Sequence, residues 1–512
     1  MSQTTSAPPT AGAAPAPTTG PSTTPHAGTE RPGPSEVRGG SRVVILGGGP
    51  GGYEGALVAA QLGARVTLIE RHGPGGSAVL TDVVPSKTLI ATAEWLTVTD
   101  SAHELGIRSD EVPESGIGDL YADLGVVNAR VRELAARQSD DIRGRLVREG
   151  VEIVDGTGAL GGVLSAGGTR RVTATLADGT VRELEAEMVL VATGATPRVL
   201  PTAEPDGERI LTWAQMYALD ELPEHLVVVG SGVTGAEFAS AYNSLGARVT
   251  LVSSRHRVLP GEDADAAGLI EDVFRRRGMT VLSRSRAAAV RRVGDGVEVE
   301  LTDGRVVEGS HCLVAVGGVP ATDGIGLEEA GVERTGSGHV VVDRVSRTRA
   351  FRVYAAGDCT GVLPLASVAA MQGRIAMWHA LGDAVQPLDL SIVSANIFTA
   401  PEIATIGATA EDCASGSVDG AISMLPLARN PRAKMLGIAD GFVKMISDRA
   451  TGTVLGGVVV APRASELILP ITLAVTHRLT VDQVANAFTI YPSLSGSITE
   501  AARTLHVAGS ES

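Results

Sequence analysis

Two stretches of the chain follow the same order of apolar run, glycine-rich turn, helical segment and second apolar run. The first begins with residues 43–46 and the second with residues 226–229, and each opening run is continuously apolar. Such runs are typical of parallel strands that are buried on both faces of a sheet. The pattern therefore predicts two α/β units, each containing a strand–turn–helix–strand motif that suits a dinucleotide.

The first unit has the features of an FAD site. Its turn matches G-x-G-x-x-G through Gly47, Gly49 and Gly52. Glycines allow a tight turn and let the backbone approach a pyrophosphate at the start of the helix. The second strand ends in Glu70, whose carboxylate is placed to accept a hydrogen bond from a ribose hydroxyl.

The second unit ends in a different way. Its turn repeats the three glycines as Gly230, Gly232 and Gly235. At the position that matches Glu70 the chain has Ser253, followed by Arg255 and Arg257. Hydroxyl and guanidinium groups suit the 2′-phosphate of NADP(H), which a carboxylate would repel. A polar turn with solvent-facing arginines is the alternative interpretation.

Further motifs follow in a fixed order along the chain. They read V-A-T-G-A-T-P at residues 191–197, V-A-V-G-G at 314–318, V-Y-A-A-G-D at 353–358 and F-T-A-P-E at 398–402. With these motifs, residues 41–508 resemble the pyridine nucleotide-disulfide oxidoreductase family. The resemblance implies an α/β fold with two Rossmann-like dinucleotide-binding domains and a C-terminal α+β dimerisation domain.

The resemblance also implies domain boundaries. The FAD-binding domain is expected at 41–200 and 325–385, and the NADP-binding domain between them at 201–324. Residues 386–508 are expected to form the dimerisation domain of a homodimer. Residues 1–40 are rich in Pro, Thr, Ala, Gly and Ser and have almost no large apolar side chains, so we expect a disordered tail.

Several site residues are implied by their places in the family motifs. Thr193, Gly194 and Gly317 belong to the two crossover motifs, and Gly357 and Asp358 to the second FAD motif, where the aspartate bonds a ribitol hydroxyl. Lys87 is expected to pair with Glu237 beside flavin N5.

Composition adds a hint about Lys87. Only three of the 43 basic residues are lysines, at positions 87, 434 and 444. A lysine in a chain that mostly uses arginine is less expected to be a casual surface charge. The alternative is a lysine on the surface of a helix.

Two departures from the family concern electron and proton transfer. Where the family has G-G-T-C-L-N-x-G-C-x-P-S-K, this chain has Ala78 and Val83 in place of the two cysteines. Where the family has H-P-x-x-x-E, the chain has Tyr491 and Gly496. The dithiol and its acid–base partner are therefore both missing, which indicates a changed electron acceptor.

In these segments the chain is similar to a disulfide-less, lipoamide dehydrogenase-like branch of actinobacterial NAD(P)H:quinone reductases. The resemblance implies hydride transfer from NADPH through FAD to a quinone. Tyr491 is either a hydrogen-bond donor to the quinone or an aromatic residue packed at the dimer seam. A soluble pyridine nucleotide transhydrogenase and an NADPH-sensing flavoprotein without turnover are the alternative functions.

Composition narrows the possible partners. The formal net charge is −15, which argues against nucleic acid as a partner. No apolar run approaches the roughly 18 residues that span a bilayer, so no membrane insertion is expected. Cys312, Cys359 and Cys413 are far apart and no histidine pair has metal-ligand spacing. We therefore expect no metal site and a cytoplasmic location.

Overall fold

The computed structural model describes residues 40–506, except for 101, 103, 108–119 and 165–167. The tail expected at residues 1–40 therefore lies, apart from Gly40, outside the described residues. The described chain confirms the predicted α/β class, with a mixed sheet in its first unit, a parallel sheet in its second and an antiparallel sheet near its C-terminus.

The first sheet joins segments that are far apart in the sequence. Its pairing is parallel from β17 to β3 and antiparallel from β3 to β5. In spatial order its seven strands are β17 (Val353–Ala355), β6 (Met188–Val191), β1 (Arg42–Leu46), β2 (Arg65–Glu70), β3 (Glu152–Val163), β4 (Arg170–Leu176) and β5 (Val181–Ala186). Because β17 pairs with β6, the two segments expected to form the FAD-binding domain contribute to a single sheet.

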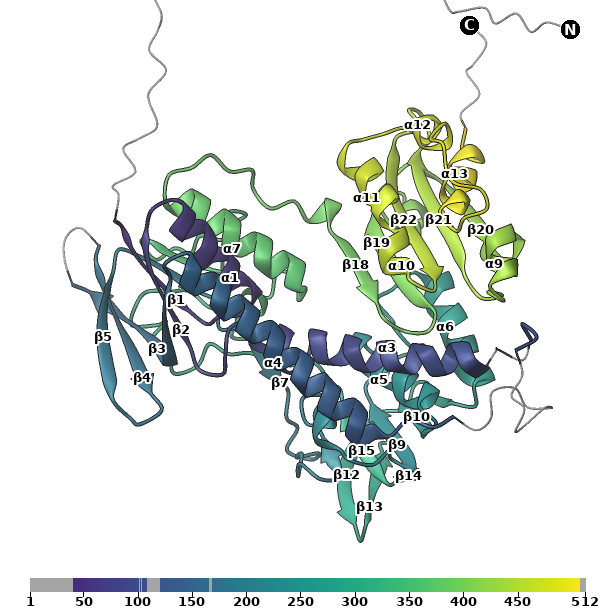
Figure 1. Cartoon of the computed structure of the whole chain (residues 1–512), viewed down its shortest axis with the longest axis horizontal. Coiled ribbons are helices and arrows are strands. Elements are labelled where there is room, and N and C mark those ends of the chain that lie inside the picture. Colours follow the sequence, from purple (N-terminus) through teal and green to yellow (C-terminus); the bar gives the residue numbers. More distant parts are fainter. Residues whose placement is uncertain (1–39, 101, 103, 108–119, 165–167, 507–512) are drawn as a thin grey trace, which may run out of the picture. The chain divides into compact units, whose positions relative to one another are not determined.

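Helices pack against this sheet and against one another. Helix α1 (Pro50–Gln61) packs along α7 (Ala366–Ala380), and α3 (Val83–Asp100) packs against α4 (Leu124–Arg148) (Figure 1). The short α2 (Gly76–Leu80) precedes α3. The Asp123 carboxylate caps α4 by accepting a hydrogen bond from the Val126 amide, which satisfies one of the free donors at the helix start.

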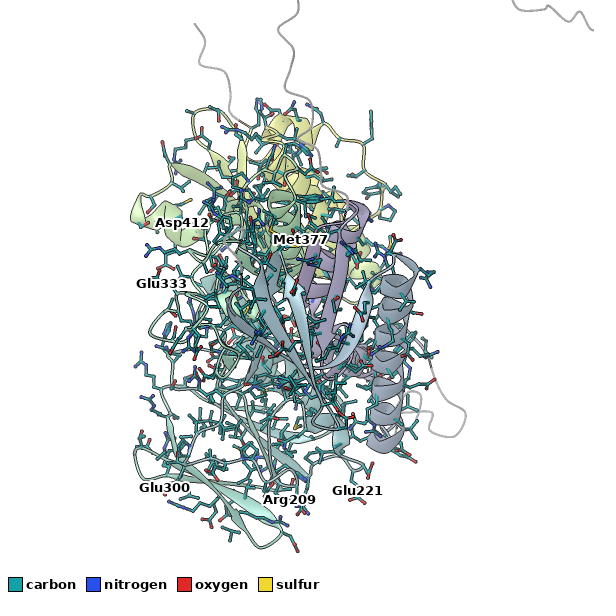
Figure 2. The ribbon with its side chains drawn as sticks, turned by 90° about the vertical axis from the view of Figure 1, so that its left-hand side faces the viewer. Arg209, Glu221, Glu300, Glu333, Met377 and Asp412 are labelled. Carbon is teal, nitrogen blue, oxygen red and sulfur yellow. The ribbon has the colours of Figure 1, made fainter. Side chains whose placement is uncertain are left out.

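The second nucleotide-binding unit has its own parallel sheet. Its strands are β11 (Thr280–Leu282), β10 (Arg248–Val252), β9 (His225–Val229), β15 (His311–Val314) and β8 (Ile210–Leu211). Helices α5 (Val233–Ser244) and α6 (Ala264–Arg276), the 3₁₀ turn η1 (Met216–Ala218) and an antiparallel sheet of β12 (Ala287–Val293), β13 (Gly296–Leu301) and β14 (Val306–Gly309) complete the unit. Glu300, labelled in Figure 2, lies on β13. Strands β7 (Ala195–Pro197) and β16 (Gly318–Pro320) pair where the chain crosses between the two units.

The C-terminal sheet is antiparallel, with two helices on its strand connections and four after its last strand. Its strands are β18 (Ser394–Ile397), β19 (Glu402–Gly407), β22 (Val454–Ala461), β21 (Phe442–Asp448) and β20 (Gly420–Pro426). The helices are α8 (Ala410–Ser415), α9 (Pro431–Met435), α10 (Ala464–Leu467), α11 (Leu469–Thr476), α12 (Val481–Ala485) and α13 (Gly496–Arg503). Short 3₁₀ turns complete the described chain as η2 (Asp358–Thr360), η3 (Leu390–Ile392) and η4 (Leu427–Arg429).

Aliphatic side chains dominate the cores of all three regions, in keeping with an aromatic content of 3%. The inner strands β1 and β9 are buried on both faces, as their continuous apolar runs predict. Across residues 40–506, as far as they are described, no helix has both the length and the apolar character needed to cross a bilayer.

Candidate functional site

The first glycine-rich turn leaves no room for a side chain at two of its positions. Gly47 has φ +96°, and a Cβ atom there would lie 2.4 Å from the Ala192 carbonyl oxygen. A Cβ on Gly52 would lie 1.9 Å from the Gly47 oxygen. Gly49, in contrast, has nothing within 4 Å of its Cβ position. The turn is therefore tight on the protein side and open at the helix start, where a pyrophosphate would bind.

The second turn repeats this geometry. Gly230 has φ +116°, and its Cβ position lies 2.2 Å from the Ala315 oxygen. The Cβ position of Gly235 lies 1.9 Å from the Gly230 oxygen, and Gly232 is open. Both turns therefore offer the same backbone cradle, so any difference in their ligands must come from the side chains around them.

Glu70 is a buried carboxylate that helps to hold the first turn. Its Oε2 atom accepts a hydrogen bond from the Gly48 amide at 2.6 Å, and its Oε1 atom accepts one from the His72 amide at 2.7 Å. The residue is 6% exposed. Oε1 also accepts a longer hydrogen bond from the Gly73 amide at 3.4 Å. Oε2 has a second lone pair, so Glu70 retains acceptor capacity for a ribose hydroxyl.

Ser253 lies inside the second unit rather than on its surface. The residue is fully buried, and its hydroxyl lies 2.6 Å from that of Ser231 in the glycine-rich turn. The Arg255 amide donates to the Ser253 hydroxyl at 3.2 Å. Ser253 therefore shapes the loop that carries the arginines, and in this conformation its hydroxyl does not face outward toward a phosphate.

Three arginines gather at the carboxyl end of strands β10 and β11. Arg255 is exposed, and its carbonyl oxygen accepts a hydrogen bond from the Arg284 amide at 2.7 Å. Arg257 is half-buried and donates to the Glu262 carbonyl oxygen at 3.2 Å. Arg284 was not singled out from the sequence, because only the pairing of β10 with β11 shows that the two loops meet.

Lys87 and Glu237 form an ion pair between the two nucleotide-binding units. Lys87 lies on α3 and Glu237 on α5, and the Nζ atom is 2.7 Å from Oε2. The other carboxylate oxygen accepts a hydrogen bond from the Phe398 amide at 2.9 Å. The Phe398 ring lies 4.8 Å from the lysine Nζ. Three regions of the chain therefore converge on a single, largely buried lysine.

Ala78 and Val83, which stand in place of the family cysteines, flank the junction of α2 and α3. Ala78 lies within α2, and Val83 is the first residue of α3. Between them, Asp82 is a largely buried carboxyl that the sequence alone did not bring to notice. Burial raises the pKa of Asp82 to about 6, with Lys87 lowering it and Glu237 and Asp358 raising it.

A cavity of about 390 Å³ lies beside this junction. Leu80 and Pro85 line it from α2 and α3, and Arg132 and Tyr217 line it from α4 and η1. The Tyr217 hydroxyl is buried and has no hydrogen-bond partner among the described residues. The volume is within the range of small-molecule sites.

The remaining residues of the predicted FAD site lie at the ends of β6 and β17. The buried Thr193 hydroxyl forms no hydrogen bond with any described residue. Burial raises the pKa of the Cys359 thiol to about 11, against a smaller lowering from Thr193 and Gly194 nearby. Burial also raises the pKa of Asp358. The Asp358 carboxylate accepts no hydrogen bond from the described chain, which leaves it free for a ribitol hydroxyl.

The glycines of these motifs support turns. Gly194, Gly317 and Gly357 have φ values of +69°, +91° and +83°. The Gly194 carbonyl accepts a hydrogen bond from the Ala321 amide at 2.9 Å, which ties the two crossover segments together.

Tyr491 is not brought to the Lys87–Glu237 pair within the described protomer. It is 83% exposed, and its neighbours Phe488 and Ile490 are also exposed. Within one protomer it is thus not packed in a core. Gly496 is the first residue of α13. In the part of the chain that the structure describes, no cluster of three His, Cys, Asp or Glu side chains could hold a metal ion.

The chain has two glycine-rich turns with the same geometry. A buried acid lies at the first turn and three arginines lie near the second. This arrangement is typical of a protein that binds two nucleotides. The family model described as "Pyridine nucleotide-disulphide oxidoreductase" matches residues 41–373, and that of its dimerisation domain matches residues 393–502. The chain therefore belongs to the pyridine nucleotide-disulphide oxidoreductase family. Membership implies FAD and NAD(P), and the open Gly49 and Gly232 cradles fit both groups.

Known relatives span nearly the whole chain. An NAD(P)H dehydrogenase (quinone) of Mycobacterium tuberculosis is 55% identical over 468 residues, covering 91% of this chain and 94% of that protein. A dihydrolipoyl dehydrogenase of Chlorobaculum tepidum is 34% identical over 468 residues, covering 90% and 96%. The crystal structure of LpdA from Mycobacterium tuberculosis matches with a TM-score of 0.86 and 54% identity, covering 91% of this chain and all of that one.

Proposed function

We propose that this protein is a flavoenzyme that transfers reducing equivalents from NADPH to a quinone without a redox-active disulfide. The proposal rests mainly on the residues at the junction of α2 and α3. There the Lys87–Glu237 pair is intact, while Ala78 and Val83 stand where the family has its cysteines. The relative that is 55% identical bears the name NAD(P)H dehydrogenase (quinone), which supports the same acceptor.

Glu70 and Asp358 would hold FAD at the first cradle, by accepting hydrogen bonds from ribose and ribitol hydroxyls. When bound, FAD supplies a group that takes a hydride from a nicotinamide and passes two electrons to an acceptor. Lys87 would place a positive charge beside it, which stabilises negative charge that develops during reduction. Glu237 holds the lysine in position, because its two oxygens are engaged by Lys87 and the Phe398 amide.

A preference for NADPH over NADH is part of the proposal. Arg255, Arg257 and Arg284 lie together where a 2′-phosphate would reach the second cradle. No acidic side chain occupies the position of Ser253, so no carboxylate would repel the phosphate there. Guanidinium groups bind phosphate through charge-assisted hydrogen bonds.

We also propose that the working form is a homodimer. The chain contains the family's dimerisation domain. Within it Phe488, Ile490 and Tyr491 are all strongly exposed in one protomer. A second copy would remove this apolar surface from water and could place Tyr491 at the seam.

The test is a comparison of acceptors on purified, FAD-loaded protein. We expect NADPH oxidation to depend on an added benzoquinone or naphthoquinone and to be negligible with lipoamide or glutathione disulfide. Parallel lines in double-reciprocal plots would identify a ping-pong order. Hydride exchange between two pyridine nucleotides without quinone turnover would favour a transhydrogenase. NADPH binding without turnover of any acceptor would favour a sensor.

A further inference from the structure

Three ionisable groups from other parts of the chain act on the carboxyl group of Asp82, at the junction of α2 and α3. They are Lys87 on α3, Glu237 on α5 and Asp358 on η2. Together with Asp82 they make three carboxyl groups and one ammonium group. Full ionisation would leave uncompensated negative charge in a region largely removed from water, which is unfavourable. These surroundings therefore favour the protonated form of at least one carboxyl group.

Asp82 is the carboxyl best suited to hold that proton. Glu237 is stabilised as a carboxylate, because Lys87 and the Phe398 amide both donate to it. The Asp82 carboxylate accepts no hydrogen bond from the described residues, and burial is the largest influence on it. Its pKa of about 6 means that it changes protonation close to neutral pH. Tyr217 on η1 also faces this group, and its pKa is raised by burial and by Asp82.

The backbone holds Asp82 in a defined place. Its amide donates to the Ser77 carbonyl oxygen at 2.8 Å, and its own carbonyl accepts from the Ser86 amide at 2.9 Å. These bonds anchor the residue to α2 on one side and to α3 on the other. The residue is partly exposed, so water can reach it.

Quinone reduction requires a proton as well as the hydride. The balanced reaction is quinone + NADPH + H⁺ → hydroquinone + NADP⁺, so one proton must travel from solution to a quinone oxygen. The His–Glu dyad of the family is replaced by Tyr491 and Gly496. Lys87 is committed to its ion pair with Glu237. Among the charged groups gathered here, Asp82 alone is both free of a hydrogen-bond partner in the described chain and next to the vacant cysteine positions.

We propose that Asp82 is the catalytic acid that protonates the quinone oxygen, an inference that rests on the quinone reductase function proposed above. The O–H bond of the carboxyl group breaks as the O–H bond of the hydroquinone forms. The carboxylate then recovers a proton from water. Because the protonated form is the active one, acceptor reduction slows as pH rises through the range in which Asp82 ionises.

The test uses Asp82→Asn in full-length, FAD-loaded protein, with Asp272→Asn as the control. Asp272 is an exposed acid on α6, so the control makes the same change in net charge elsewhere. Each variant is assayed with NADPH and either 1,4-benzoquinone or ferricyanide between pH 5 and 8. Ferricyanide takes up electrons without protons, so it reports whether the protein is folded, loaded and reducible. A second readout is the infrared carboxyl band of a protonated acid.

We expect Asp82→Asn to lower quinone turnover about 100-fold at pH 6, a typical effect of losing a general acid, and to abolish its pH dependence. Ferricyanide turnover should stay within about twofold of the parent rate. The carboxyl band that titrates near pH 6 should disappear in this variant and persist in Asp272→Asn.

Three results would overturn the inference. Unchanged quinone turnover in Asp82→Asn would show that the proton comes from elsewhere. An equal loss with both acceptors would show a structural role. A parent protein that reduces ferricyanide but no quinone would defeat the proposed function itself, and the inference with it.

Discussion

The two nucleotide-binding units share a backbone and differ in charge. In both, the first glycine has a positive φ and the third packs against the first, with Cβ positions 1.9 Å from a carbonyl oxygen at Gly52 and at Gly235. In the first unit the second strand ends in a buried carboxylate. In the second it ends in a buried hydroxyl followed by arginines. The two units therefore share the backbone of a dinucleotide site, and under the proposed function the strand end selects which dinucleotide binds.

The buried residue at each strand end has a second task. Glu70 accepts hydrogen bonds from the Gly48 and His72 amides, so it braces its turn while offering charge to a ligand. Ser253 braces its turn through Ser231 and leaves the surface to Arg255. A carboxylate can serve both purposes at once, but a short hydroxyl cannot. This division explains why the second unit has its charged groups further along the chain, at Arg255 and Arg257.

The largest effect is expected at the first unit. Glu70→Ala removes the acceptor of three amide hydrogen bonds and of the proposed ribose contact, and each charge-assisted bond contributes about 1.5–3 kcal/mol. FAD affinity should therefore fall by roughly 100-fold or more, measured by flavin fluorescence titration. The control is Glu185→Ala, an exposed acid in the same sheet. Normal flavin content in Glu70→Ala would show that the Glu70 carboxylate is not needed for FAD binding in the first unit.

The next effect concerns the pair that joins the two units. Lys87→Met should leave FAD bound but slow its reduction by NADPH roughly 100-fold, because a preorganised charge is lost and Glu237 is left without its partner. Rapid mixing with NADPH in a stopped-flow instrument measures this rate. Lys434→Met serves as the control, since that lysine is exposed on α9. An unchanged rate of flavin reduction in Lys87→Met would show that the Lys87–Glu237 ion pair has only a structural role.

A smaller, selective effect is expected at the second unit. Arg255→Ala should raise the KM for NADPH about tenfold through loss of one charge-assisted phosphate contact, with little change for NADH. Arg248→Ala, at the opposite end of β10, is the control. Equal catalytic efficiency with NADPH and NADH in the parent protein would show that these arginines do not discriminate between the two nucleotides.

The smallest effect is a pH dependence of stability that arises in the second unit. His311 on β15 accepts a hydrogen bond from Arg209, labelled in Figure 2, at 3.0 Å. Burial, followed by Arg209, lowers the pKa of His311 to about 4. Since the unfolded histidine takes up its proton near pH 6.5, stability should fall as pH drops from 6.5 toward 4. Between pH 7 and pH 5, His311→Gln should lose about 2 kcal/mol less unfolding free energy than the parent protein. The same loss in both proteins would contradict this assignment.

The sequence predicted the fold well because the fold rests on local patterns. Continuous apolar runs mark the buried strands β1 and β9, and the glycine spacing marks the turns after them. The meeting of Lys87 with Glu237 depended on the family resemblance, since no local pattern links residues so far apart. Their role beside a flavin stays a prediction.

The scarcity of lysine was an uneven guide. Lys444 is 2% exposed and pairs with Asp263 and Asp265, at 2.7 and 2.6 Å. Lys87 is also largely buried and paired. Lys434, however, is exposed. Two of the three lysines therefore form ion pairs shielded from much of the solvent. The composition alone could not identify their partners.

Asp82 shows what sequence reasoning could not reach. A single aspartate in a polar turn carries no local signal, because its ionisation depends on burial and on Lys87, Glu237 and Asp358, which come from three other segments. The orientation of Ser253 was equally hidden. Whether a hydroxyl faces inward or outward is decided by the turn it packs against, here through Ser231.

The central claim is that electrons pass to the acceptor without a dithiol. Anaerobic titration of the FAD-loaded protein with dithionite tests it most directly. A single two-electron equivalent per flavin should bleach the flavin absorbance completely, with no long-wavelength band from a thiolate–flavin complex at any stage. The need for a second equivalent, or the appearance of that band, would show that a thiol pair takes part and would contradict the account.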